Sequence, residues 1–480
     1  MSETSREAWR VFWSSNISKL GINLLAILVI VSLYVVFTYP LDFGLKYWNN
    51  PAHWVDYPKG VPPEWAKYFT SENVTEHRIY TLYVPSESRF VEAAGLYIKR
   101  YVITFDYQYD EFPSFLSFTV FNVTFNREPP IIFLEISRPD GVSARIYTLA
   151  VPGPQEGEKK PYMRYSETPF RVFLSGDPSV AQQLSRMLKR DFDISLTPTE
   201  INTIGPEKIL FGEPDTGKNF TILKGVYRVD VVLASSDEKD SVGYVRFVVA
   251  GNVYGWVGTD SLGRDLAVGL LFGFPVALLI GVVTTTLTTA VGATAGIISG
   301  YVGGKTDDII QRIADVINNI PLLPILIFLI FVLKPSIWLI VFLLVAFGWP
   351  GLTIIVRSMV LQLRTSQLVE AEVALGASKW RIMFRHIFPQ IAPFIFAQMI
   401  FATPTAILAE AALSFLGLGD PSLPTWGQIL NYGFRDGGVY VGYWWWIVPP
   451  GLLIVLTAIT FVFLALGLEP VVNPRLRRFK

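Results

Sequence analysis

The feature that most constrains this chain is a set of six apolar runs, each 20 residues long or longer. They cover residues 20–39, 270–299, 309–333, 337–356, 391–418 and 444–468. The hydrocarbon layer of a bilayer is about 30 Å thick, and a helix rising 1.5 Å per residue needs about 20 apolar residues to cross it. The sequence therefore predicts a mainly α-helical integral membrane protein with six membrane-spanning helices.

The first of these runs also has to be compared with a secretory signal peptide. Its apolar core, 20–39, is longer than the 7–15 residues usual in a signal peptide, and no small-x-small cleavage site follows it. We therefore expect an uncleaved anchor.

Composition excludes several classes of function. The formal net charge is +0, which argues against a nucleic-acid partner. The chain has no cysteine, so disulfides, thiolate catalysis and cysteine metal sites are excluded, and no metal site is expected.

Basic residues in the short loops predict how the chain crosses the membrane, because lysine and arginine favour the cytoplasmic side. Thirteen flank one set of helix ends: Arg6, Arg10, Lys19, Lys305, Arg357, Arg364, Lys379, Arg381, Arg385, Arg475, Arg477, Arg478 and Lys480. Only Lys334 and Arg435 lie in the short loops opposite. We expect a multi-pass protein of the plasma membrane, with residues 1–19, 357–386 and 469–480 cytoplasmic and residues 41–258 outside.

The 41–258 segment is expected to be a soluble, mainly-β domain between the first two spans. Stretches 78–84, 132–136, 227–233 and 244–249 are rich in β-branched and aromatic residues and are separated by turn-forming residues. This pattern indicates a β-sandwich-like fold. One amphipathic helix is expected at 178–189, with Asp177 as its N-cap.

Three asparagines of this domain lie in N-x-T sequons, namely Asn73, Asn122 and Asn219. Surface glycosylation would agree with the outward placement. Coincidence in a threonine-containing β domain is the alternative.

The hydrophilic segment 357–386 contains a candidate helix around residues 368–375. Leu368, Val369, Val373 and Leu375 alternate with charged residues over about three turns, and Gly376 fits a C-terminal turn. An ordinary amphipathic helix at the membrane surface is the alternative explanation.

Glycines and charged residues mark other positions in the apolar runs. Gly292, Gly296 and Gly300 share one helix face, which indicates close packing against another helix of this chain or of a second subunit. Arg312 is spaced to pair with Asp308 and Asp315, with gating by Asp315 as the alternative.

Glu410 lies deep in an apolar run without a cationic neighbour. It is expected either to line a translocation path or to accept hydrogen bonds that hold a helix break near Gly417.

Four blocks resemble one known family. Residues 370–376, followed by Phe388 and Pro389, resemble the E-A-A-x-x-x-G coupling helix of ATP-binding-cassette (ABC) importer permeases. Residues 258–265, 410–419 and 473–477 resemble three further blocks of the C-type permease in the peptide/nickel importer family. The first of these contains Gly258, Thr259, Asp260, Gly263, Arg264 and Asp265.

The resemblance implies the type I ABC importer permease fold for residues 259–468. It assigns contact with the ATPase to Glu370, Ala371, Glu372, Leu375, Gly376, Ala377 and Pro389. Two residues depart from the pattern: Glu372 replaces an alanine, and His386 replaces an isoleucine. The domain at 41–258 is not covered, because typical members have a much shorter loop there.

By resemblance, the partners are a homologous permease, two cytosolic ATPases and an external substrate-binding protein. ATP and Mg²⁺ belong to the ATPases, because strings 212–218 and 304–306 only partly match a phosphate-binding loop. The chain is therefore expected to be non-catalytic. Oligopeptides or dipeptides are the expected cargo, with oligosaccharides as the alternative. A secondary transporter and a surface receptor are the competing hypotheses.

Overall fold

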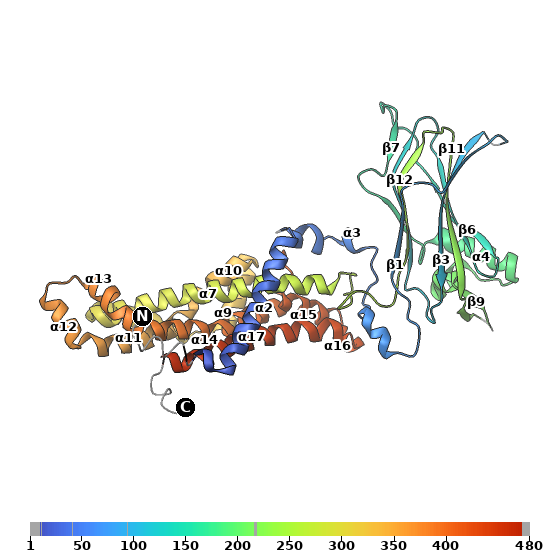
Figure 1. The fold of residues 1–480 in the computed structure, drawn as a ribbon. Helices are drawn as coiled ribbons and strands as arrows, with labels where there is room; N and C mark the ends of the chain where they lie inside the picture. Colours follow the sequence, from blue (N-terminus) through green and yellow to red (C-terminus); the bar gives the residue numbers. More distant parts are fainter. Residues whose placement is uncertain (1–9, 11, 41, 94, 216–217, 473–480) are drawn as a thin grey trace. The chain divides into compact units, whose positions relative to one another are not determined.

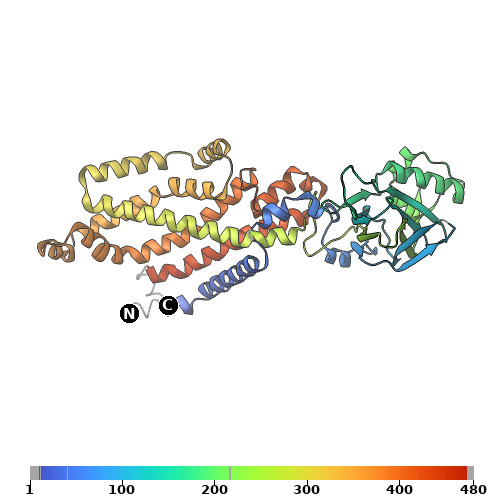
Figure 2. The same cartoon turned by 90° about the horizontal axis from the view of Figure 1, so that it is seen from above.

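The apolar runs fold into helices in the computed structural model, which describes residues 10, 12–40, 42–93, 95–215 and 218–472. The chain divides into two units, which can be followed by colour in Figures 1 and 2. The helical unit combines Met1–Pro51 with Leu266–Lys480. The β-rich unit is Ala52–Asp265, which in sequence lies between the first two long helices. Residues 473–477 and the basic residues Arg6, Arg475, Arg477, Arg478 and Lys480 lie outside the described residues.

Among the described residues, five helices or helix combinations are long and apolar enough to cross a membrane. They are Asn16–Thr38, Leu266–Val302, Ile337–Arg364, Lys379–Phe415 and Trp444–Val471. The elements of the helical unit are α2 (Asn16–Thr38), η1 (Gly44–Trp48), α7 (Leu266–Val302), α8 (Gly304–Asn318), α9 (Leu322–Leu333), α10 (Ile337–Gly348), α11 (Pro350–Arg364), α12 (Gln367–Ala374), α13 (Lys379–Arg381), η3 (Ile382–Ile387), α14 (Phe388–Phe415), α15 (Trp426–Arg435), α16 (Gly438–Val441) and α17 (Trp444–Val472).

The predicted third span, 309–333, is not one straight helix. Helices α8 and α9 meet at an angle of 84°, so they are either one broken span or a re-entrant pair. Pro321 lies between them, and proline cannot donate the backbone hydrogen bond that would continue the helix. At 12 residues, α9 is about 18 Å long and is too short to cross a bilayer by itself.

The glycine face of α7 packs against α11, a helix of the same chain. A Cβ on Gly296 would lie 2.7 Å from the Val356 Cβ, and one on Gly300 would lie 2.8 Å from the Val360 Cβ. Thr353 of the same partner helix, α11, donates a 2.9 Å hydrogen bond to the Gly292 carbonyl. The glycine face of α7 therefore packs against an internal helix, and the close approach requires residues without a side chain.

The β-rich unit contains two five-stranded antiparallel sheets. The first consists of β1 (Arg78–Leu82), β12 (Ser241–Val249), β4 (Leu116–Phe125), β7 (Tyr162–Arg164) and β8 (Phe170–Phe173). The second consists of β2 (Glu87–Val91), β3 (Leu96–Tyr107), β11 (Gly225–Ser235), β5 (Ile131–Ser137) and β6 (Ser143–Ala150). A further pair joins β9 (Gly212–Pro214) to β10 (Phe220–Ile222). All four predicted strand regions are confirmed as β1, β5, β11 and β12.

One hydrophobic core lies between these two sheets. It receives alternate residues of several strands, such as Ile103 and Phe105 from β3 and Val245 and Phe247 from β12. Because successive side chains of a strand point to opposite faces, this alternation leaves the other face of each sheet for polar residues. The arrangement is that of a β-sandwich.

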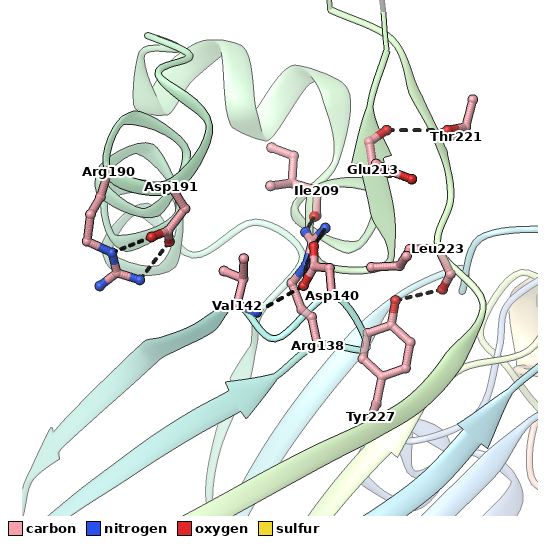
Figure 3. A network of polar contacts seen from close by, with 10 residues as sticks. All are labelled: Arg138, Asp140, Val142, Arg190, Asp191, Ile209, Glu213, Thr221, Leu223 and Tyr227. Atoms are coloured by element: carbon pink, nitrogen blue, oxygen red, sulfur yellow. Dashed lines mark hydrogen bonds and ion pairs between the residues drawn. The ribbon is translucent and has the colours of Figure 1, made fainter.

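Short helices cover part of this unit: α3 (Pro51–Trp54), η2 (Glu64–Phe69), α4 (Pro178–Phe192), α5 (Pro198–Ile204) and α6 (Pro206–Leu210). The predicted helix at 178–189 is confirmed as α4, and the Asp177 carboxylate accepts hydrogen bonds from the backbone at its start. Figure 3 shows how Arg138, at the turn after β5, holds the end of α6 through a 2.6 Å bond to the Ile209 carbonyl. Asp140 pairs with the same arginine at 2.8 Å, so its buried charge is compensated.

One partly buried histidine is expected to make the stability of the β-rich unit depend on pH. The His77 ring lies between Tyr57 and Tyr254, and neither of its nitrogens has a hydrogen-bond partner among the described residues. Burial lowers the pKa of His77 to about 4, against about 6.5 in an unfolded chain. The folded form holds the neutral ring, so this stability is full above pH 6.5 and is lost as the pH falls towards 4.

We expect this unit to lose about 2 kcal/mol of stability between pH 7 and pH 5. Hydrogen exchange of the core strands β4 and β12, corrected for intrinsic rates, measures the loss. In His77→Phe most of the pH dependence should disappear. An unchanged pH dependence in that variant would show that another group is responsible.

Candidate functional site

The hydrophilic segment forms a short helix, α12, as the sequence predicts. It is eight residues long, which is about two turns and not three. Val369 is the only buried residue of this helix, and it packs in a cluster with Ile382, Met383 and Ile387 of η3. Val369 is therefore the one buried apolar side chain through which this helix packs against the rest of the unit.

The remaining apolar residues of this region have no such packing. Five large side chains, which we name the α12 apolar surface, are exposed: Leu368, Val373, Leu375, Trp380 and Phe384. Leu375 is 83% exposed, and the Trp380 and Phe384 rings stack on each other 5.6 Å apart. Exposed apolar groups in an otherwise charged segment are typical of a surface that binds a partner.

Helix α12 is followed by Gly376, whose backbone has the left-handed conformation. Its φ is +78°, its N–H donates to the Val373 carbonyl, and the Ala377 N–H donates to the Glu372 carbonyl, both at 3.0 Å. This pair of bonds is the Schellman motif, in which glycine is favoured because it has no Cβ. The predicted C-terminal turn is confirmed.

A new helix begins directly after this turn. Ser378 Oγ accepts a hydrogen bond from the Arg381 N–H, and the helix continues from Lys379 to Phe415. Pro389 is exposed and follows the π-helical turn η3. Ala371 is exposed on α12, and Ala377 lies in the turn.

A polar cavity of about 330 Å³ lies against α12. Glu370, Arg364 and Lys379 line it together with Tyr301 at the end of α7. No ion pair joins Glu370 to either base within the part of the chain that the structure describes. Glu370 thus keeps an exposed carboxylate beside the α12 apolar surface.

The two departures from the family pattern lie next to each other. Glu372 of α12 and His386 of η3 are in contact, with Oε1 and Nε2 3.4 Å apart, and the contact is an ion pair when His386 is protonated. Both side chains are mostly buried, and the contact ties the two sides of the Gly376 turn together. Sequence spacing gives no signal that these two residues would meet.

This pair should contribute a small, measurable coupling energy. Glu372→Ala, His386→Ile and the double variant form a thermodynamic cycle. We expect an interaction energy of up to about 1 kcal/mol in thermal or denaturant unfolding, because the pair is partly screened by water. Additive effects of the two changes would mean that the residues act independently.

The proposed pairing of Arg312 with Asp308 and Asp315 is wrong. No ion pair joins Arg312 to either residue among the described residues, and Asp315 is exposed. Arg357 of α11 instead forms a two-bond ion pair with Asp307, with Nε–Oδ1 and Nη2–Oδ2 distances of 2.6 and 2.5 Å. Helical spacing considers only partners on one helix, so it missed an arginine that lies 50 residues away.

Glu410 is buried, at 6% exposure, and accepts a 2.6 Å hydrogen bond from Ser414. One turn later α14 ends in a second Schellman motif, where Gly417 has φ +82° and its N–H donates to the Ser414 carbonyl. Gly419 and Gly427 both lie against Ser414, so the helix end is closely covered by the start of α15. These contacts fit the helix-end role considered for Glu410 better than a position in an open path.

The block 258–265 forms a tight loop directly before α7. Asp260 Oδ1 accepts from the Leu262 and Arg264 N–H groups at 2.9 Å, and Oδ2 accepts from Arg264 Nε at 2.5 Å. Asp260 and Arg264 form an ion pair within this turn. Burial raises the pKa of Asp260, and the Arg264 guanidinium opposes that shift. Gly263 has φ +82°, and Thr259 and Asp265 form an isolated bridge that closes the loop.

The sequon asparagines differ in their surroundings. Asn73 is exposed, but its Nδ2 donates to the Gln108 carbonyl at 2.9 Å. Asn122 lies on β4 with φ +52° and is only partly exposed, whereas Asn219 is exposed. In the described ranges, no three histidine or acidic residues cluster as metal ligands would. Residues 216–217 of the partial phosphate-loop string lie outside those ranges.

Comparison with known proteins identifies the helical part of the chain. Residues 292–478 match the family described as binding-protein-dependent transport system inner membrane component. The chain is 36% identical over 224 residues to the dipeptide transport system permease protein of Bacillus subtilis, which covers 46% of this chain and 69% of that protein.

Two oligopeptide transport system permease proteins are similar to the same extent. That of Bacillus subtilis is 38% identical over 224 residues (46% of this chain, 72% of the relative). That of Haemophilus influenzae is 33% identical over 223 residues (46% of this chain, 71% of the relative). The chain therefore belongs to the family of binding-protein-dependent inner membrane components, the permease subunits of ABC importers.

Proposed function

We propose that this chain is a permease subunit of an ATP-driven peptide importer and that α12 receives the movement of the ATPase. Cargo is inferred from the relatives, which are named as dipeptide and oligopeptide transport system permeases. The chain would form half of the translocation path, with a homologous permease as the other half. ATP and Mg²⁺ would be bound by two partner ATPases.

The α12 apolar surface is the observation that carries this proposal. Leu368, Val373 and Leu375 are exposed in a segment rich in charge, so water is an unfavourable neighbour for them. A groove on another protein would remove them from water, as in the recognition of amphipathic helices. Glu370, exposed on the same helix, would add charge complementarity at the rim.

The excess of basic residues in one set of loops supports a topology in which α12 faces the ATPases. Residues 1–19, 357–386 and 469–480 would face the cytoplasm and the ATPases, and the β-rich unit would lie outside. An external substrate-binding protein would be the natural partner of that side. Glu410 would act by holding the end of α14 near the path, with Asp315 as the less favoured gate.

Co-purification tests the role of α12. The permease, its partner permease and the ATPases are expressed together, and the ATPases retained on the tagged permease are quantified. Val373→Asp should reduce retention at least tenfold, since a charge replaces an apolar side chain that the ATPase would bury. Val226→Asp is the matched control, because Val226 on β11 is equally exposed, at 56% each.

Equal retention in both variants would refute the docking role of α12. The competing functions make different predictions. Uptake that follows an ion gradient in the absence of any ATPase would indicate a secondary transporter. Binding to an external ligand without any uptake would indicate a surface receptor.

A further inference from the structure

A polar row crosses the outer face of the first sheet of the β-rich unit. Thr81, Arg246, Thr119 and Arg171 are successive cross-strand partners on β1, β12, β4 and β8. Arg246 Nε donates to Thr81 Oγ1, and Arg171 Nε donates to Thr119 Oγ1, each at 3.2 Å. The threonines thus orient both guanidinium groups, because each fixes one of the donors.

Asp56, from the segment before β1, lies between the two arginines. Its Oδ2 accepts from Arg246 Nη1 at 2.8 Å and from Arg171 Nη2 at 3.1 Å, and the residue is 4% exposed. Its other oxygen, Oδ1, is buried and has no hydrogen-bond partner among the described residues. The two guanidinium groups therefore lie side by side, because they share one carboxylate oxygen.

The charges of Asp56, Arg171 and Arg246 do not balance. Two arginines face one aspartate, which leaves one positive charge that no other acidic lining residue compensates. Arg171 Nη1 and Arg246 Nη2 make no hydrogen bond or ion pair within the described residues. Their side chains are 20% and 28% exposed, so both remain accessible from the cavity beside them.

The cavity beside the arginines has room for a small ligand. Its volume is about 360 Å³, and its lining combines polar groups with Ile79, Pro169 and Tyr244. Arg246 lies over the Tyr244 ring, 5.3 Å from its centre, which keeps this guanidinium in place. Small-molecule sites commonly combine an apolar wall with a few fixed polar groups in this way.

We propose that this cavity is a binding site for a monocarboxylate that carries an apolar group. The carboxylate would accept from Arg171 Nη1 and Arg246 Nη2, since arginine donors match the two oxygens of a carboxylate. The apolar group would lie against Tyr244 and Ile79. A single negative charge fits better than a phosphate dianion, because the unpartnered Asp56 Oδ1 repels further negative charge.

Two sources can supply this chemistry: the free carboxyl end of a short peptide and a small organic acid. Calorimetric titration of the purified full chain in lipid nanodiscs can distinguish them. The probes are Gly-Gly-Phe, its C-terminal amide and phenylpropionate. Gly-Gly-Phe should bind at least tenfold more tightly than the amide. Equal binding of phenylpropionate assigns the site to organic acids, and tighter binding of the tripeptide assigns it to peptides.

Substitutions separate this site from any other on the chain. Arg171→Gln and Arg246→Gln should each weaken binding of Gly-Gly-Phe at least tenfold. Asp56→Asn should tighten it, because the repulsive charge is removed while the shape is kept, and an unfolded variant could not show this gain. Arg145→Gln is the matched control, since Arg145 pairs with Glu135 on the other sheet.

Three results would overturn the proposal. One is equal affinity for the acid and the amide, and a second is unchanged affinity in both pocket-arginine variants. The third is displacement of Gly-Gly-Phe by inorganic phosphate at equal concentration, which would indicate a general anion site. The site does not depend on the proposed transport function, so a failed transport assay leaves these measurements interpretable.

Discussion

Replacing Gly296 with leucine will prevent the helical unit from folding stably. The first side-chain carbon would lie 2.7 Å from the Val356 Cβ and 2.8 Å from the Thr353 carbonyl oxygen, and both belong to the facing helix α11. Backbone cannot move aside as a flexible side chain can, so the two helices must separate. In lipid, close packing is the main force that holds helices together. We expect a loss of about 3 kcal/mol or more.

Size-exclusion chromatography of a fluorescent fusion, before and after heating, measures this loss. Gly451→Leu is the matched control, because Gly451 lies in α17 and a Cβ added there would have no atom within 4 Å. The control should give a peak like that of the unaltered protein. If both variants are equally unstable, leucine is harmful for a reason other than packing against α11.

Replacing Gly376 with valine will leave the protein folded and strongly reduce coupled transport. A Cβ at Gly376 would meet nothing within 4 Å, so the substitution causes no collision. The cost comes from the backbone, since a φ of +78° is unfavourable for a β-branched residue by about 1–3 kcal/mol. Relief of that strain would open the Schellman turn and change the direction of α12. We expect peptide-stimulated ATP hydrolysis of the assembled complex to fall about tenfold, with less loss for Gly376→Asn.

The control is the same substitution at another glycine with a positive φ. Gly442 has φ +85° and is equally open, but it lies beside α17, away from α12. Gly442→Val should cost similar stability and leave the stimulated hydrolysis within about twofold of normal. An equal loss of hydrolysis in both variants would mean that global destabilisation, and not the α12 turn, explains the effect.

The sequence predicts well what depends on neighbouring residues. The strands β1, β5, β11 and β12 and the helix α4 with its Asp177 cap follow from alternation, periodicity and capping chemistry over a few residues. The Gly376 turn is predictable for the same reason. Hydropathy predicts a single span at 309–333, whereas α8 and α9 meet at 84°. The difference arises because hydropathy contains no information on how Pro321 changes the direction of the helix.

Contacts between distant residues are not predictable in this way. The Asp307–Arg357 pair joins two helices, and the Asp56 pairs join residues 115 and 190 positions apart. From the sequence alone, an arginine on the outer face of a strand is indistinguishable from an ordinary solvated charge. Only the strand register puts Arg171 and Arg246 in one row, and register follows from the packing of the whole sheet.

The helix that starts at Lys379 has a mechanical consequence. It continues for 37 residues, from Lys379 beside the Gly376 turn to Phe415 beside Glu410. At a rise of 1.5 Å per residue, this helix is roughly 55 Å long. A tilt of roughly 5° at one end would displace the other by roughly 5 Å. Pro393 and Pro404 interrupt its backbone hydrogen bonds, so the stiffness at these two points sets how much of the tilt reaches the far end.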